Sequence, residues 1–226
     1  MSVLVLAAHP DDEVLGCGGT IARLAAQGER VDVAILGEGI TSRYADRSQA
    51  NPGELEVLRA CSRTAAAVLG VHELHLFDLP DNRFDTVPLL DIVKLIEGLI
   101  EQIKPSVVYT QHGGDLNVDH RALYEATLAA TRPLPGSCVR SVLSYEVASS
   151  TEWAFGQFAP AFRASVFVDI SETLPAKIEA MQAYESEARA FPHPRAPESL
   201  EAMARRWGST VGVAAAEAFA LVREVR

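Results

Sequence analysis

The chain has 226 residues, of which 48% are hydrophobic and 22% charged, and its formal net charge is −10. These values are typical of a globular protein with a sizeable core, and the length suits a single α/β domain over residues 1–226. The acidic balance argues against nucleic acid or an anionic membrane surface as the main partner, because proteins that bind either one normally carry a basic patch. The scattered cysteines Cys17, Cys61 and Cys138 contain no C-x-x-C pair, so we expect reduced thiols without a metal-binding or redox role.

Predicted strands and helices alternate along the first half of the chain. They are a strand at 3–8, a helix at 15–27, a strand at 31–36, a helix at 54–69, a strand at 74–77, a helix at 89–103, a strand at 106–110 and a helix at 119–131. This alternation predicts a Rossmann-like α/β fold, in which a mostly parallel sheet carries helices on both faces. The first apolar run is too short for a signal peptide or a membrane span, so we expect a cytoplasmic protein.

The second half extends this pattern less regularly. Two further strands are predicted, at 141–147 and 165–168, and we expect them to enlarge the sheet. The remaining tail is predicted to be helical, over 173–190, 197–206 and 211–223.

A cluster of titratable residues follows the first strand: His9, Asp11, Asp12 and Glu13. Pro10 ends the strand, because proline fits neither a central strand nor a helix interior. An imidazole beside carboxylates suits a divalent metal such as zinc. The alternative is a solvated acidic loop, or carboxylates placed at the positive end of the next helix.

A second polar cluster, residues 111–120, follows the strand that ends at Thr110. Ligands of open α/β sheets bind at the carboxyl ends of the strands, so both clusters are expected at one edge. His9, Asp12 and His120 would then supply three metal ligands and leave a fourth position open. That arrangement is typical of catalytic zinc, with one ion per chain.

At this point the chain resembles the LmbE-like (PIG-L) deacetylases. The resemblance lies in Ala8-His9-Pro10-Asp11-Asp12-Glu13, Asp119-His120-Arg121-Ala122-Leu123, Leu79-Pro80-Asp81-Asn82, Pro192-His193-Pro194-Arg195 and Ala216-Glu217-Ala218-Phe219. It implies a zinc-dependent enzyme that removes acetyl groups from N-acetylamino sugars attached to larger molecules. Carried over by position, it implies that His9, Asp12 and His120 are the ligands and that Asp11 is the general base.

The expected chemistry needs a carboxylate that is not a metal ligand, to take a proton from water and pass it to the departing amine. Asp11 fits, because alternation along an extended segment would aim it differently from Asp12; its alternative role is a helix N-cap. Asp119 is expected to orient a histidine. Many relatives have histidine at the position of Asn117, and asparagine can donate a hydrogen bond to an oxyanion but cannot carry a proton.

Several other residues are candidates with an open alternative. The general-acid role falls to Asp11 alone or to another imidazole, His112 or His193. Arg43 and Arg59 compete for an oxyanion or substrate contact, with surface salt bridges as the alternative. Three further candidates for contact with a small-molecule substrate are Trp153, which could stack on a sugar or pack in the core, and His193 and Arg195, whose Pro-rich loop could cover the crevice.

Two other functions remain open on the sequence. One is a zinc amidase for a non-acetyl or non-sugar substrate. The other is a nucleotide-binding module, for which Gly16-Cys17-Gly18-Gly19 is weak support because it is not G-x-G-x-x-G and follows three acidic residues. The sequence leaves the oligomeric state open.

Overall fold

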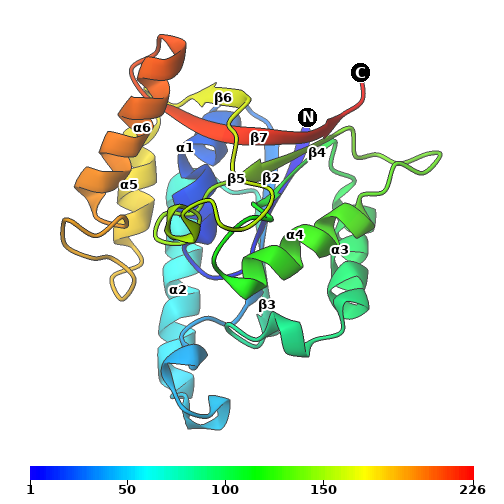
Figure 1. The fold of residues 1–226 in the computed structure, drawn as a ribbon, viewed down its shortest axis with the longest axis vertical. Helices are drawn as coiled ribbons and strands as arrows, with labels where there is room; N and C mark the ends of the chain where they lie inside the picture. Colours follow the sequence, from blue (N-terminus) through cyan, green and yellow to red (C-terminus); the bar gives the residue numbers. More distant parts are fainter.

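The computed structural model describes residues 1–226 and contains a seven-stranded sheet with the order β3-β2-β1-β4-β5-β7-β6 (Figure 1). The strands are β1 (Ser2–Ala7), β2 (Arg30–Gly37), β3 (Glu73–Leu79), β4 (Val107–Gln111), β5 (Ser141–Tyr145), β6 (Val166–Asp169) and β7 (Ala216–Glu224). The first five strands pair in parallel, and β7 is antiparallel to both of its neighbours. The expected mostly parallel α/β sheet is therefore confirmed.

Helices cover both faces of this sheet. They are α1 (Asp12–Ala26), α2 (Pro52–Leu69), α3 (Leu89–Ile103), α4 (Val118–Ala130), α5 (Leu174–Gln182) and α6 (Pro197–Val211). In Figure 1, α3 and α4 lie on one side, and α1, α2, α5 and α6 lie on the other. Alternate residues of β1 feed the two cores, since Val3 and Val5 belong to the larger apolar cluster while Leu4 and Leu6 belong to the smaller. Because β1 is buried on both faces, all of its central residues are apolar, which explains the unbroken apolar run in the sequence.

The order of the strands in the sheet changes direction at β1, and this point locates the candidate site. β1 pairs with β2 on one side and with β4 on the other, so the connections that leave these strands diverge. Ligand crevices of open α/β sheets form outside the carboxyl ends at such a point. The N-termini of α1 and α4, which follow β1 and β4, therefore face the same crevice.

The C-terminal tail differs from the sequence-based prediction. The helix predicted over 211–223 is wrong, because residues Ala216–Glu224 form β7, between β5 and β6. The alanines of this segment favour a helix in isolation. Between β5 and β6, however, its backbone forms hydrogen bonds with a strand on each side, and these outweigh its helix propensity. The helix predicted over 173–190 is too long, since α5 ends at Gln182.

The glycines near the start of α1 lie inside the helix, which begins at Asp12 rather than at the predicted Leu15. A Cβ atom on Gly16 would lie 2.1 Å from the ring of Tyr145, and one on Gly19 would lie 2.7 Å from Ile170. These two glycines let α1 pack closely against its neighbours, which offsets their low helix propensity.

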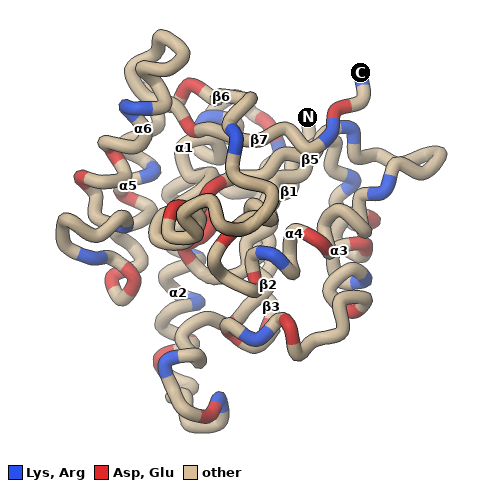
Figure 2. Tube along the Cα trace, in the orientation of Figure 1, with Lys and Arg blue, Asp and Glu red and all other residues tan.

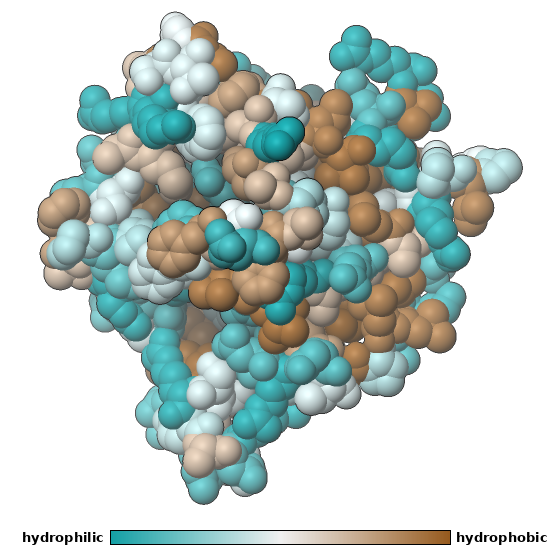
Figure 3. Space-filling model, in the orientation of Figure 1, coloured by the Kyte–Doolittle hydropathy of each residue, from teal (hydrophilic) through white to brown (hydrophobic).

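The surface carries charges of both signs. Figure 2 shows acidic and basic residues interspersed, without a broad basic face in this view. Figure 3 shows apolar atoms among polar ones over α3 and α4, where Leu89, Leu90 and Leu128 are exposed. None of the helices combines the length and the apolar character needed to span a membrane.

Candidate metal centre and active site

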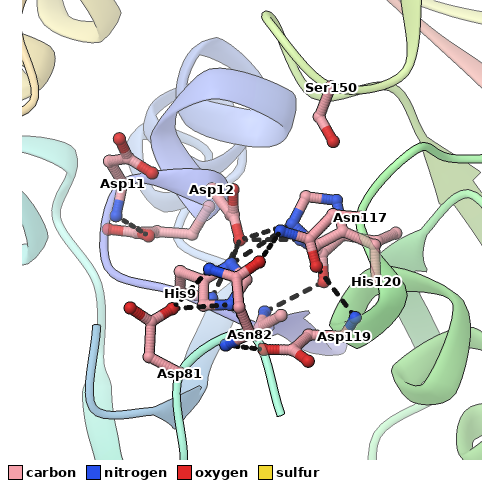
Figure 4. Close-up of polar contacts among 12 residues, drawn as sticks. His9, Asp11, Asp12, Asp81, Asn82, Asn117, Asp119, His120 and Ser150 are labelled. Carbon is pink, nitrogen blue, oxygen red and sulfur yellow. Dashed lines mark hydrogen bonds and ion pairs between the residues drawn. The ribbon is translucent and has the colours of Figure 1, made fainter. Parts of the chain in front are cut away.

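Three chain segments meet at the carboxyl edge of the sheet. His9 follows β1, Asp12 opens α1, and His120 lies in the first turn of α4. The three side chains point toward one another in Figure 4. Asp12 and His120 are buried and His9 is mostly buried, so their contacts form in a site largely closed to water.

The three potential ligand atoms form a nearly equilateral triangle. His9 Nδ1 lies 3.2 Å from Asp12 Oδ2 and 3.3 Å from His120 Nε2, and His120 Nε2 lies 3.3 Å from Asp12 Oδ2. Ligands about 2.0–2.1 Å from a tetrahedral zinc ion are separated by about 3.3–3.4 Å, the edge of that tetrahedron. The donor set and its spacing therefore fit zinc, with the fourth corner left for another ligand.

A buried carboxylate lies beside each histidine on the side away from the triangle. Asp119 Oδ2 lies 2.8 Å from His9 Nε2, and Asp119 also accepts hydrogen bonds from the backbone N–H groups of Asn82 and Phe84. Asp115 Oδ1 lies 3.2 Å from His120 Nδ1. Both contacts leave the triangle-facing nitrogens, His9 Nδ1 and His120 Nε2, available as ligands, as carboxylate partners do in zinc proteins.

The surrounding charges favour a cation at this point. Burial lowers the pKa of His120, but Asp12 and Asp115 outweigh it and raise that pKa to about 9. Burial also lowers the pKa of His9, yet hydrogen bonds with Asp119 and Asp12 leave it well above its ordinary value. Asp12 shows the converse: burial raises its pKa, but the two imidazoles hold it well below the ordinary value. A divalent cation held by these atoms would supply the positive charge that the carboxylates favour.

Asp11 is aimed away from Asp12 by its backbone. Its φ of 101° lies in the left-handed region, which is strained for a residue with a side chain but tolerated by aspartate. The two carboxylates diverge in Figure 4, as expected, but this strained turn rather than strand alternation separates them. The Asp11 side chain makes no N-cap hydrogen bond. Burial raises its pKa, the opposing charge of Arg195 does not cancel this, and the value lies well above the ordinary range.

A cleft of about 180 Å³ opens beside the triangle. Its polar lining comes from the loops after β1, β2 and β3, from the start of α4 and from the segment before α6: His9, Asp11, Ser42, Arg43, Asp81, Asn82, Asn117, Glu187 and Arg195. Asn117 caps α4 through its Oδ1 and donates from Nδ2 to Asn82. Of the predicted arginines, the structure brings Arg43 and Arg195 to this cleft.

Two predicted residues lie elsewhere. His112 does not line the cleft, because its Nε2 lies 2.7 Å from the carbonyl oxygen of Pro160 and its Nδ1 lies 3.3 Å from Ser144 Oγ. These contacts join the ring to strand β5 and to the loop at Pro160, as the loop-ordering alternative to a direct catalytic role implies. Arg59 is paired with Asp78 on the surface of α2, outside the cleft, as its salt-bridge alternative predicted.

Trp153 and His193 stand near the cleft but do not line it. Their rings pack edge to face with centroids 5.5 Å apart, and Trp153 is 41% exposed, which excludes the core-packing alternative. His193 Nδ1 accepts a hydrogen bond from the backbone N–H of Arg195, so this pair adjoins the segment that carries Arg195 into the cleft.

Sequence reasoning missed several residues that build the site. Gln111 donates from Nε2 to Asp12 Oδ2 at 2.7 Å, Asp115 contacts His120, and Asp81 Oδ1 lies 3.4 Å from His9 Nε2. Gln111 is the last residue of β4, and Asp115 and Asp81 follow the carboxyl ends of β4 and β3. The same rule that located the two histidine motifs therefore also pointed to these residues.

Comparisons with known protein families and with individual proteins point to the same family. The family described as "PIG-L: GlcNAc-PI de-N-acetylase" matches residues 4–131, more than half of the chain. The uncharacterised deacetylase YaiS of Escherichia coli is 32% identical over 155 residues, which are 66% of this chain and 75% of YaiS.

Two further proteins match over most of their length. A probable N-acetyl-α-D-glucosaminyl L-malate deacetylase 2 of Bacillus cereus is 26% identical over 84% of each chain. The structure of N,N'-diacetylchitobiose deacetylase from Pyrococcus horikoshii superposes with a TM-score of 0.77 at 20% identity, covering 98% of this chain and 84% of that one. At that identity the structural likeness supports the fold alone.

Proposed function

Since the chain belongs to the PIG-L family of de-N-acetylases, we propose that it is a zinc-dependent hydrolase of an N-acetylamino sugar or an N-acetylglucosaminyl conjugate. The observation that carries this proposal is the triangle formed by His9, Asp12 and His120, whose edges of 3.2–3.3 Å suit a tetrahedral zinc ion beside a polar cleft.

In this proposal the three triangle residues hold the metal, and Asp119 and Asp115 fix the orientation of His9 and His120. Zinc, when bound, polarises the amide carbonyl and lowers the pKa of water toward about 7. The protein residues supply the remaining parts: a base for water, a proton for the leaving amine, and a donor for the oxyanion.

Asp11 is proposed as that base and proton donor. It lines the cleft with His9, its side chain has no capping role, and its raised pKa brings it closer to the pH at which a general base works best. Asn117 also lines the cleft, and an Nδ2 hydrogen not used by Asn82 could be donated to the oxyanion. Because Asn117 cannot carry a proton, Asp11 serves both proton transfers.

The size and lining of the cleft support a compact polar substrate group. Its volume of about 180 Å³ lies below the roughly 300–1,000 Å³ of pockets for drug-sized ligands. One amino-sugar unit suits the space, with the rest of a conjugate outside it. The substrate named for the Bacillus cereus relative, an N-acetylglucosaminyl conjugate of malate, has this form.

The alternatives differ in what they release or bind. A non-acetyl or non-sugar amidase would release another acid or amine from the same site. A nucleotide-binding module is disfavoured, because the N-terminus of α1 carries Asp11, Asp12 and Glu13 where a phosphate needs unopposed backbone N–H groups.

The proposal is tested by comparing Asp11→Asn and Asp12→Ala with the zinc-loaded wild type. Acetate release from N-acetylglucosaminyl conjugates is measured together with the zinc content per chain. We expect Asp12→Ala to lose zinc, and Asp11→Asn to keep it while kcat falls about 10²- to 10⁴-fold, the usual contribution of a general base.

The control is Asp91→Asn, which makes the same chemical change at an exposed position of α3 and should alter neither quantity. Near-normal turnover by Asp11→Asn would refute the assignment of the base. Full zinc retention by Asp12→Ala would refute the metal site, and release of an acid other than acetate would favour the amidase alternative.

A further inference from the structure

The Asp11 carboxylate forms a salt bridge with one residue of the protein, Arg195. Arg195 Nη1 donates to Asp11 Oδ2 at 2.7 Å, across 184 positions of sequence. Oδ1 of Asp11 has no hydrogen-bond partner in the protein, although the side chain lines the cleft. The two carboxylate oxygens are therefore in different situations: one is bound, and the other is free for water or substrate.

The guanidinium of Arg195 is itself held by two further contacts, one from the loop after β5 and one from within its own segment between α5 and α6. Its Nε donates to Ser149 Oγ at 2.9 Å, and its Nη1 lies 3.4 Å from Glu187 Oε2. Glu187 is bound at its other oxygen by Arg43. Alternating charges thus run from Arg43 at the edge of the cleft, through Glu187 and Arg195, to Asp11 in the interior. Arg195 is only 22% exposed, which limits its freedom to adopt other rotamers.

We propose that Arg195 is a positioning residue for Asp11: its guanidinium, clamped by Ser149 and Glu187, binds Oδ2 and so presents Oδ1 to the cleft. This inference rests on the proposed role of Asp11 as general base. It replaces the expectation that Arg195 binds substrate, and it gives the motif Pro192-His193-Pro194-Arg195 a task inside the site.

Two features of the structure explain why Asp11 requires a contact such as the one with Arg195. Asp11 has a strained left-handed backbone at a turn, so no regular element fixes its side chain. It is also next to Asp12 and Glu13, with all three carboxylates buried. Without a cation, repulsion would favour rotation of the Asp11 carboxylate away from its neighbours. Arg195 supplies that cation and also a fixed direction, because a guanidinium donates from a rigid planar fork.

A double-mutant cycle tests the proposal on the zinc-loaded full chain. The four proteins are wild type, Arg195→Ala, Asp11→Asn and the double variant, assayed for kcat, KM and zinc content. We expect Arg195→Ala to lower kcat about 10- to 100-fold, the cost of a misplaced catalytic group, while KM and zinc content stay within about threefold. In the Asp11→Asn background, removal of Arg195 should lower kcat by no more than about twofold.

Two variants refine the cycle. Arg195→Lys keeps the positive charge but loses the fork that reaches Asp11 and Ser149 together, so its kcat should fall between those of Arg195→Ala and wild type. The matched control is Arg63→Ala, because Arg63 is an exposed arginine of α2 paired with Glu56 and remote from the cleft. Its kinetic constants should equal those of wild type.

Other outcomes would overturn the inference. A rise in KM with unchanged kcat would show that Arg195 binds substrate. A full additional loss of kcat in the Asp11→Asn background would show that Arg195 acts independently of Asp11. Loss of zinc from Arg195→Ala would show that it supports the metal site.

A substrate-free measurement separates this proposal from the proposed function. Urea unfolding of the same four proteins gives the coupling between Asp11 and Arg195, which we expect to change the unfolding equilibrium constant at least about twofold beyond additivity. If this coupling is present but the wild type deacetylates no sugar conjugate, the proposed function fails while the contact stands. If it is absent, the positioning role fails whatever the activity.

Discussion

Among single residues, Asp119 connects the proposed metal ligand His9 to the rest of the cleft. Its side chain is fully buried, with Oδ2 2.8 Å from His9 Nε2 and 2.6 Å from the backbone nitrogen of Asn82, and Oδ1 2.8 Å from that of Phe84. Asp119 thus fixes the ring of His9 and also the turn after β3 that carries Asp81 and Asn82 into the cleft. Its oxygens accept from two backbone N–H groups, and with His9 Nδ1 as a metal ligand, His9 Nε2 would carry a proton and be the third donor.

Asp119→Asn should therefore weaken zinc binding without unfolding the protein. The amide nitrogen of asparagine would face an N–H donor, so either the His9 contact or a backbone contact is lost. We expect the Kd for zinc to rise about 10- to 100-fold, as for other partners of metal-binding histidines. Competition with a chromogenic chelator measures this. Glu125→Gln, an exposed acid-to-amide change on the same helix, is the control, and equal affinities for the two variants would contradict the prediction.

At the scale of elements, a buried ion pair joins α1, α5 and β7. Lys177 Nζ lies 2.5 Å from Glu217 Oε1 and donates to the carbonyl oxygen of Leu15 at 2.8 Å. Glu217 also accepts hydrogen bonds from the backbone N–H groups of Gly19 and Thr20. This network ties the helix that follows Asp11 and Asp12 to the antiparallel strand of the sheet. It links the tail of the chain to the helix that begins at the N-terminal motif.

Lys177→Met should destabilise the fold strongly. The change leaves Glu217 buried without its cation, since both side chains are only 3–4% exposed. Removing one partner of a buried pair typically costs about 3–5 kcal/mol. Urea unfolding measures the loss, which Lys177→Met/Glu217→Gln should partly recover. Lys94→Met, at an exposed pair on α3, should change the free energy of unfolding by less than about 1 kcal/mol. Equal effects at both lysines would refute the network's role.

At the scale of the whole molecule, the site lies where elements from distant parts of the chain converge. His9 and Asp12 come from its start, His120 from its middle and Arg195 from near its end. The sheet brings the first three together, because β1 and β4 are neighbours in the sheet although more than 100 positions separate them in sequence. A ligand that joins such segments stabilises the folded state as a whole, since the unfolded chain cannot assemble the three ligands.

Removing the metal should accordingly lower the thermal stability. At a free zinc concentration of 100 times its Kd, binding contributes about 2.7 kcal/mol to the free energy of unfolding. For a chain of this length that corresponds to a Tm shift of about 5–10 °C. Calorimetry after chelation and after readdition of zinc measures the shift. Asp12→Ala should show no response to zinc, and a shift as large as that of wild type would point to binding elsewhere.

The sequence alone determined what depends on local pattern. The apolar stripe from Leu89 to Ile103 predicted α3 at its observed bounds, because helical periodicity is a property of neighbouring residues. Strand–helix alternation predicted the parallel sheet, and hence the edge at which His9, Asp12 and His120 meet. The meeting of these three residues could be predicted because the order of strands and helices along the chain leaves few possible sheet topologies.

Tertiary structure decided what depends on partners distant in sequence. Residues 216–224 are a strand because β5 and β6 leave a place between them, which their alanine-rich sequence does not reveal. His112 points away from the cleft because Pro160 and Ser144 bind its ring. The contact between Arg195 and Asp11 depends on the path of the loop before α6, which no periodicity encodes. The sequence therefore predicted a candidate metal site at the first motif, but the different surroundings of Asp11 and Asp12 depend on contacts made only in the fold.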